Sequence, residues 1–137
     1  MADTVSTQII QDGGRTAIIK TTVVIGAGSP PPPQEVTLVD VSALAVDPIT
    51  KRACTAVTLV GLTYIGVGVG VELEWDATAN VLIFDLPVDW TEQYDFGDFG
   101  IPNNAGAGKS GDIVATTVAP TAGDTYTFIF TVQKLYA

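Results

Sequence analysis

The most constraining feature of this sequence is a run of nineteen residues without a charged side chain, residues 53–71. Its length matches the roughly 20 apolar residues of a transmembrane helix. Its composition does not, because the run contains four glycines and three threonines among many valines. Glycine and β-branched residues are poor helix formers, whereas Val, Thr and Tyr favour sheets. We therefore predict two adjoining strands or one long bent strand, and no membrane association.

The rest of the chain also favours strands. Segments rich in Thr, Val and Ile are separated by turn signals such as Asp12-Gly13-Gly14. No segment repeats its apolar residues at the helical period. We predict an all-β fold, a single-domain antiparallel β-sandwich or jelly roll with about eight strands. The expected strands are residues 5–11, 15–25, 35–41, 52–64, 70–76, 81–86, 112–118 and 125–132.

Two features bear on the domain organisation. Residues 1–11 are expected to form an N-terminal arm or edge strand, and residues 12–137 a single β-sandwich domain. Pro30–Pro33 predict a stiff extended connection rather than a domain boundary, because proline fixes φ and lacks an N–H donor. The first residues lack the basic and apolar regions of a signal peptide, so none is expected.

The composition excludes several kinds of chemistry. The chain has no histidine and one cysteine, which removes His-dependent catalytic triads, imidazole ligands, thiolate zinc sites and internal disulfides. Fifteen acidic and six basic residues give a net charge of −9, which argues against binding to nucleic acid. Only 15% of residues are charged, against about 25% in ordinary domains. We expect no enzyme and no cofactor, but a binding or structural module whose charge-poor surface is covered by a partner.

Two glycine-rich motifs resemble catalytic signatures without their context. Asn103–Ser110 ends in Gly-Lys-Ser like a phosphate-binding loop, but position 103 is not glycine and a predicted strand follows instead of a helix. We interpret it as a turned surface loop. Asp95-Phe96-Gly97 is a triplet found in kinases, whose other signature segments are missing here.

Four aromatic residues gather in the segment 89–101, in which we expect residues 95–100 to be a glycine-hinged loop. They are Trp90, Tyr94, Phe96 and Phe99. Aromatic anchors rimmed by acids are typical of protein interfaces. They could equally plug an open end of the sandwich, and both interpretations stay open.

Acidic residues concentrate between Glu72 and Asp112. Glu72, Glu74 and Asp76 alternate, so we expect all three on one strand face. Such a face is solvated, meets a basic partner, or holds calcium, although no EF-hand spacing is present. A glycosidase carboxylate pair could be drawn from these acids, but nothing selects one.

The glycines at 66, 68 and 70 also alternate. On a single strand they would share one face and leave a groove there, where another backbone or an aromatic ring could lie.

Several segments together resemble small virion structural proteins of tailed bacteriophages. They are Asp12-Gly13-Gly14-Arg15 with Lys20, Trp75-Asp76-Ala77-Thr78, Asn103–Asp112 and Gly123-Asp124-Thr125-Tyr126-Thr127. Pro30–Pro33 and the glycine–valine run are departures from that group.

The resemblance implies a capsid decoration or cement protein that multimerises on the head and stabilises it. The implied partners are the major capsid protein or other virion proteins, together with further copies of the chain, a trimer being one arrangement. The implied location is the capsid surface, after synthesis in the host cytoplasm. The alternative is a tail- or fibre-associated module that binds a receptor or glycan.

Overall fold

The computed structural model describes residues 4–26, 35–97, 99–118 and 123–136. Nearly all regular structure in these residues is β, the exception being a short 3-10 turn, η1 (Val41–Ala43). The strands are β1 (Thr4–Asp12), β2 (Thr16–Val24), β3 (Glu35–Val39), β4 (Cys54–Val67), β5 (Gly70–Trp75), β6 (Val81–Leu86), β7 (Thr91–Asp95), β8 (Ile113–Val118) and β9 (Thr125–Tyr136). Pro30–Pro33 lie outside the described residues.

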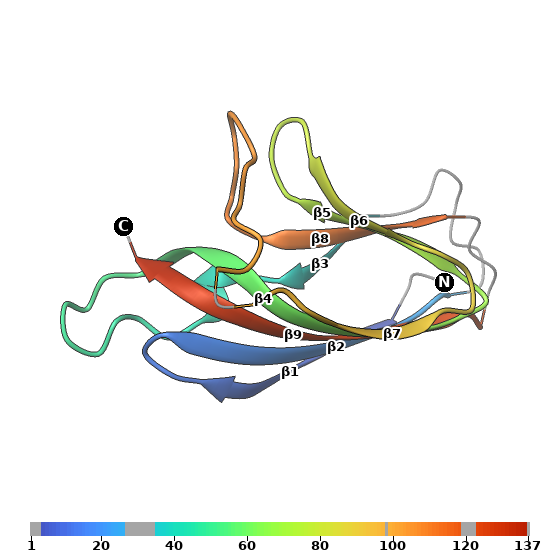
Figure 1. Cartoon of the computed structure of the whole chain (residues 1–137), viewed down its shortest axis with the longest axis horizontal. Coiled ribbons are helices and arrows are strands. Elements are labelled where there is room, and N and C mark those ends of the chain that lie inside the picture. The colour runs from blue at the N-terminus through green and yellow to red at the C-terminus, as the bar shows by residue number, and fades with distance from the viewer. Residues whose placement is uncertain (1–3, 27–34, 98, 119–122, 137) are drawn as a thin grey trace.

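The strands form two antiparallel sheets packed face to face (Figure 1). The five-stranded sheet has the order β1-β2-β9-β4-β7, and the four-stranded sheet has the order β3-β8-β5-β6. Without β1, the two orders are those of an eight-stranded jelly roll, in which the chain repeatedly crosses between sheets. The predicted all-β sandwich or jelly roll is confirmed. β1 adds a ninth strand at one edge of the five-stranded sheet.

One strand was missed in the sequence. We predicted no strand between residues 86 and 112, but Thr91–Asp95 form β7, which pairs with Gly61–Ile65 of β4. Three of its five residues are Glu92, Gln93 and Asp95, which strands rarely favour. Pairing with the long neighbour β4 overrides that weak preference.

The uncharged run contains two strands, as one of the two predictions stated. β4 lies in the five-stranded sheet and β5 in the four-stranded sheet, and the chain crosses between them at Gly68 and Val69. Within the described residues there is no helix long and apolar enough to span a membrane.

The expectation that three alternating glycines share one strand face is wrong. Gly66 is in β4, Gly70 begins β5, and Gly68 sits in the connection with a φ of 82°. That φ suits glycine, because other residues are strained there. Only Gly66 makes room for a ring: a Cβ at this position would collide with the side chain of Tyr64.

The core is filled by the inward alternation of β9. Tyr126, Phe128 and Phe130 are fully buried, as the sequence pattern indicates. The rings of Phe128 and Phe130 stack with centroids 5.1 Å apart. Trp75 from the four-stranded sheet is 1% exposed and belongs to the same core cluster.

A buried ion pair holds the β1–β2 hairpin to β9. The Lys134 side chain is fully buried, and its Nζ donates to a carboxylate oxygen of Asp12 at 2.6 Å. The same Nζ also donates to the carbonyls of Gly13 at 3.1 Å and Ala45 at 2.8 Å. The second Asp12 oxygen accepts from the Ala45 N–H at 2.7 Å. We call this group the Lys134 clamp; it ties three separate segments together.

Candidate functional site

The outer face of the five-stranded sheet is almost without charge, and we call it the neutral face. The strand registers place residues from all five strands in rows across it. Three complete rows are Ser6–Thr22–Thr127–Ile65–Thr91, Gln8–Lys20–Ile129–Thr63–Gln93 and Gln11–Ile18–Thr131–Gly61–Asp95. Each row is about 19 Å long, since it crosses four interstrand spacings. Lys20 and Asp95 are the only charged residues in these rows.

Apolar side chains are exposed on the neutral face. Ile65 is 46% exposed and Val67 is 57% exposed, both from β4, and Val24 of β2 is 39% exposed. Threonines fill much of the remaining surface, and the hydroxyls of Thr22 and Thr127 are hydrogen-bonded to each other at 3.1 Å. Such a mixture of β-branched side chains is suited to a protein contact, because interface cores are depleted of charge.

A shallow cavity of about 310 Å³ lies on the neutral face around Gly61. Its lining includes Thr63, Gln93, Ile129 and Thr131 from the rows above. Gly61 has no side chain, so the face is hollowed where β4 passes between β7 and β9. A Cβ at Gly61 would come no closer than 3.5 Å to another atom, so the hollow is open space rather than a tight approach.

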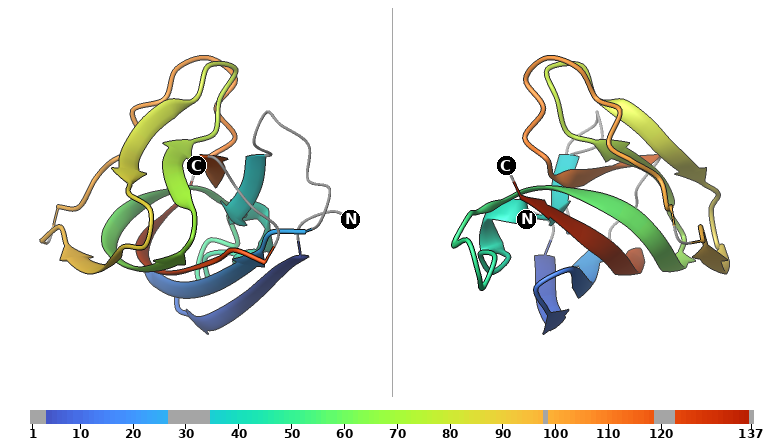
Figure 2. Two further views of the ribbon diagram at one scale, coloured as in Figure 1. Left: turned by 90° about the vertical axis from the view of Figure 1, so that its right-hand side faces the viewer. Right: turned by 60° about the vertical axis from the view of Figure 1, so that its left-hand side comes forward.

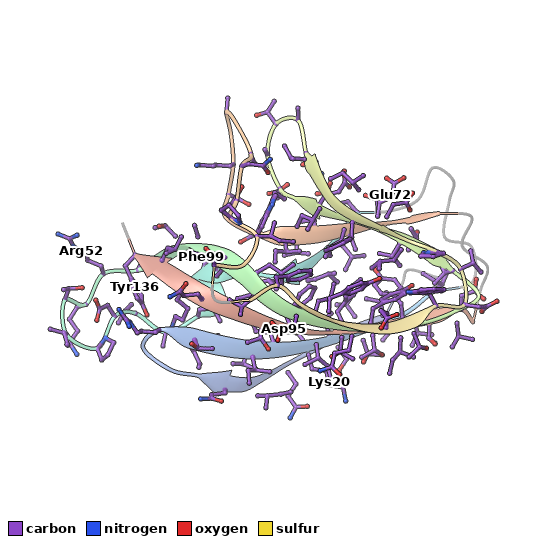
Figure 3. All side chains as sticks on the ribbon, in the orientation of Figure 1. Lys20, Arg52, Glu72, Asp95, Phe99 and Tyr136 are labelled. Carbon is purple, nitrogen blue, oxygen red and sulfur yellow. The ribbon has the colours of Figure 1, made fainter. Side chains whose placement is uncertain are left out.

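The outer face of the four-stranded sheet is acidic, and we call it the acidic face. One row across it is Glu35–Thr116–Glu72–Asp85, and the next contains Glu74. Figure 3 shows Glu72 and Lys20 on opposite sides of the molecule, one on each outer face. The two faces of the sandwich therefore differ sharply in charge.

The three alternating acids, Glu72, Glu74 and Asp76, have different hydrogen-bond partners and do not form one cluster. Glu72 and Glu74 point outward from β5, and Glu74 accepts a hydrogen bond from the Thr116 hydroxyl at 2.9 Å. Asp76 follows the last residue of β5, and its carboxylate accepts from the Ser110 hydroxyl at 2.6 Å. In the described residues, no three acidic or cysteine side chains are grouped so as to hold a metal ion.

Asp112 is a described acid whose surroundings disfavour the negatively charged form of its side chain. Burial raises the pKa of its carboxyl, and the neighbouring charges of Asp40 and Asp76 raise it further. The N–H of Val41, which donates to Asp112 at 3.0 Å, opposes this shift in the pKa. The carboxylate holds η1 to the start of β8, so its role is structural.

Two of the four candidate aromatics close one side of the sandwich. Tyr94 of β7 and Phe96 just after it stack with Phe84 of β6, with ring centroids 5.2 Å and 5.4 Å from Phe84. All three are partly buried against the core. Since β6 and β7 are the adjacent edges of the two sheets, this stack covers the gap between them. The structure thus favours the plug interpretation for Tyr94 and Phe96.

The other two aromatics are exposed but far apart. Trp90 is 40% exposed and Phe99 is 93% exposed. The Trp90 carbonyl accepts from the N–H of Gly66 at 2.9 Å, whereas residue 101 pairs with Leu59. These two positions on β4 are seven residues apart, or roughly 23 Å. Trp90 and Phe99 therefore form no shared stacking platform.

The glycine-rich segment 103–110 is a loop that leads into β8, not into a helix. It lies beside the β5–β6 turn: the Thr78 N–H donates to the Ala107 carbonyl at 3.2 Å, and the Ser110 N–H to the Asp76 carbonyl at 3.2 Å. Figure 1 shows the two loops projecting together from the top of the molecule. The interpretation of this segment as a turned loop is confirmed, and the strand predicted after it is β8.

Another cavity, of about 550 Å³, lies at the end of the five-stranded sheet near the Lys134 clamp. Its lining includes Arg15, Pro48, Ile49, Leu135 and Tyr136. None of the described acids from Glu72 to Asp95 lines this cavity. The described carboxylates that were considered for a glycosidase pair therefore do not line this cavity.

Comparisons with known proteins give no family. No protein-family model matches the chain, and no curated protein matches it. One solved structure, a mutant of the family 29 carbohydrate-binding module CBM29-2, matches with a TM-score of 0.45 and 13% sequence identity. The match covers 96% of this chain and 86% of that chain.

Proposed function

We propose that the chain is a non-enzymatic structural protein of a bacteriophage virion, a capsid decoration or cement protein. In this role it binds the major capsid protein through the neutral face and stabilises the head. The observation that carries the proposal is that the neutral face spans five strands with only Lys20 and Asp95 charged.

The charge distribution supports a defined orientation on such a surface. Although the chain has a net charge of −9, Asp95 is the one acid in the rows of the neutral face, and several other acids lie on the opposite sheet. Burying the neutral face leaves few charges to desolvate, whereas burying the acidic face requires a basic partner. The neutral face then meets the capsid and the acidic face stays in solvent.

Several of the segments that resemble phage virion proteins form turns and main-chain hydrogen bonds that connect the strands. Trp75–Thr78 and Asn103–Asp112 contact each other through main-chain hydrogen bonds. Asp12–Arg15 forms the hairpin turn at the Lys134 clamp. The resemblance therefore involves residues that maintain one fold rather than scattered matches.

The test is co-sedimentation of purified variants with phage particles that incorporate the chain. Ile65→Lys places a charge on the neutral face, and Leu82→Lys places the same charge on the acidic face. Both wild-type side chains are well exposed, 46% for Ile65 and 54% for Leu82, so both variants are expected to fold. We expect Ile65→Lys to lose binding and Leu82→Lys to keep it.

Two results would contradict the proposal. Normal binding by Ile65→Lys, with loss of binding by Leu82→Lys, would move the contact to the acidic face. Cross-linking to neither capsid nor tail proteins would remove the virion role itself. Binding to a glycan array that Trp90→Ala abolishes would favour the receptor- or glycan-binding alternative.

A further inference from the structure

We propose that two copies of this chain pair through the open edge of β1, joining their five-stranded sheets into one continuous sheet. The pairing is antiparallel and two-fold symmetric, with the axis near Thr7. It uses the backbone edge of β1, at the border of the neutral face to which Ser6 and Gln8 contribute, and it is testable on the isolated protein.

β1 is exposed along its whole length in the described structure. Every residue from Thr4 to Gln11 is exposed, including Val5 at 43%, Ile9 at 40% and Ile10 at 51%. In the described chain β1 pairs with β2 alone, which leaves one row of backbone donors and acceptors free. Figure 2 shows β1, in dark blue, as the outermost strand of its sheet.

Within the described residues, the inward side of β1 is only partly covered, because the four-stranded sheet ends at β3. Thr7 and Ile9 border a small cavity of about 60 Å³ whose lining includes Leu38 of β3. Val5 and Ile9 pair with Val23 and Ile19, so they point to the same side as these two buried residues. β3 lies over β2, where the Thr21 hydroxyl donates to the Leu38 carbonyl at 3.0 Å. Val5 and Ile9 thus have the direction of core residues but the exposure of surface residues.

The other three sheet edges carry charges that discourage strand pairing. β3 begins with Glu35, β6 contains Asp85, and β7 contains Glu92 and Asp95. β1 has no charge from Thr4 to Gln11 and no proline. Natural sheets protect exposed edges with charges, prolines or bulges, and β1 has only a bulge, near Ile10.

The edge is complementary to itself. With the axis at Thr7, Val5 of one copy lies opposite Ile9 of the second copy, and Ser6 lies opposite Gln8. Apolar and β-branched pairs of this kind stabilise antiparallel strands. The register uses residues 4–10 and places no pair of like charges opposite each other.

The charge of this edge is also compatible with pairing to a second copy of the chain. The β1–β2 hairpin, residues 4–25, carries Asp12, Arg15 and Lys20, a net charge of +1, within a chain of −9. Two acidic molecules therefore meet little charge repulsion at this edge. A trimer would require β1 to pair with a different edge, and each of those is acidic.

The first test is sedimentation velocity over a wide range of concentrations. The wild-type protein is expected to form a reversible dimer. Thr7→Lys sets two lysines opposite each other at the axis and is expected to raise the dimer Kd at least about tenfold. The matched control is Thr91→Lys, at an exposed position of the other edge strand, β7, which should leave the Kd unchanged.

Cross-linking tests the register without depending on a destabilising charge. Directly opposed residues of antiparallel strands have Cα atoms about 4.5–5.5 Å apart, which suits a disulfide. Thr7→Cys is expected to oxidise to a covalent dimer and Thr91→Cys to stay monomeric. The native Cys54 is 4% exposed and does not compete.

The proposal is overturned by a wild-type monomer at all concentrations, by a trimer, or by a dimer that Thr7→Lys leaves intact. Absence of the Thr7→Cys cross-link in a folded variant overturns it too. Each of these results leaves the virion role to be decided by its own particle-binding experiment.

Discussion

Removing the acid from the Lys134 clamp should destabilise the protein strongly. Asp12→Ala takes away the one carboxylate that, among the described residues, is bonded to a lysine whose side chain is fully buried. It also leaves the Ala45 N–H, which donates to Asp12 at 2.7 Å, without that acceptor. Two carbonyl acceptors, of Gly13 and Ala45, remain for Nζ but carry no full charge.

The expected loss is about 3–5 kcal/mol in the free energy of unfolding, the usual cost of breaking a buried ion pair from one side. Whole-domain stabilities are about 5–15 kcal/mol, so this is a large fraction. It corresponds to a fall in Tm of roughly 10–15 °C for a chain of this size. Asp12→Asn retains an acceptor of the same shape and should lose less. Lys134→Met removes the buried charge itself and should also lose less.

The assay is urea unfolding at pH 7 followed by tryptophan fluorescence, since Trp75 is 1% exposed and reports on the core. The control is Glu92→Ala, an exposed acid of the edge strand β7, which should stay within about 0.5 kcal/mol of the wild type. Hydrogen bonds raise the pKa of Lys134 against the effect of burial. Lys134 is therefore charged at pH 7, and its contribution is lost only as the pH rises through that pKa.

A loss below about 1 kcal/mol for Asp12→Ala would refute this reasoning, because the lysine would then be adequately solvated without its partner. A loss equal to that of Asp12→Asn would show that shape rather than charge matters in the clamp.

Two further predictions concern carboxylates. Asp112→Asn should stabilise the protein at pH 7, because the raised pKa of Asp112 means that the fold disfavours its ionised form. The gain in stability should vanish as the pH falls below the ordinary pKa of 3.8, where the side chain at position 112 is neutral in both proteins. Urea unfolding midpoints of the two proteins at pH 7 and below pH 3.8 measure this difference. Asp85→Asn should stabilise by about 0.2–1 kcal/mol at low salt, because Asp85 lies directly opposite Glu72, and the gain should shrink in high salt. An Asp85→Asn gain that is independent of salt would contradict the repulsion.

Local patterns were sufficient to predict most of the fold. The alternation of Tyr126, Phe128 and Phe130 predicts a strand with one buried face, and Asp12-Gly13-Gly14 predicts the first hairpin. The composition of residues 53–71 separates strands from a membrane helix. These signals are all contained in neighbouring residues, which is why sequence reasoning finds them.

Features that depend on distant pairing were not predicted. β7 exists because β4 is beside it, and its own residues argue against a strand. The row Glu35–Thr116–Glu72–Asp85 requires the registers of four strands. One available signal was overlooked: Lys134 continues the inward alternation of β9, and a lone charge among buried apolar positions indicates a buried partner.

The central claim is that the neutral face is the contact surface with the capsid. A cryo-EM reconstruction of a particle containing the chain tests it most directly. We expect density for the jelly roll on the outside of the head, with Ile65 and Thr63 against capsid subunits and Glu72 facing solvent. Density that places Glu72 against the capsid and Ile65 in solvent would contradict it, as would a particle in which the chain contacts no capsid subunit.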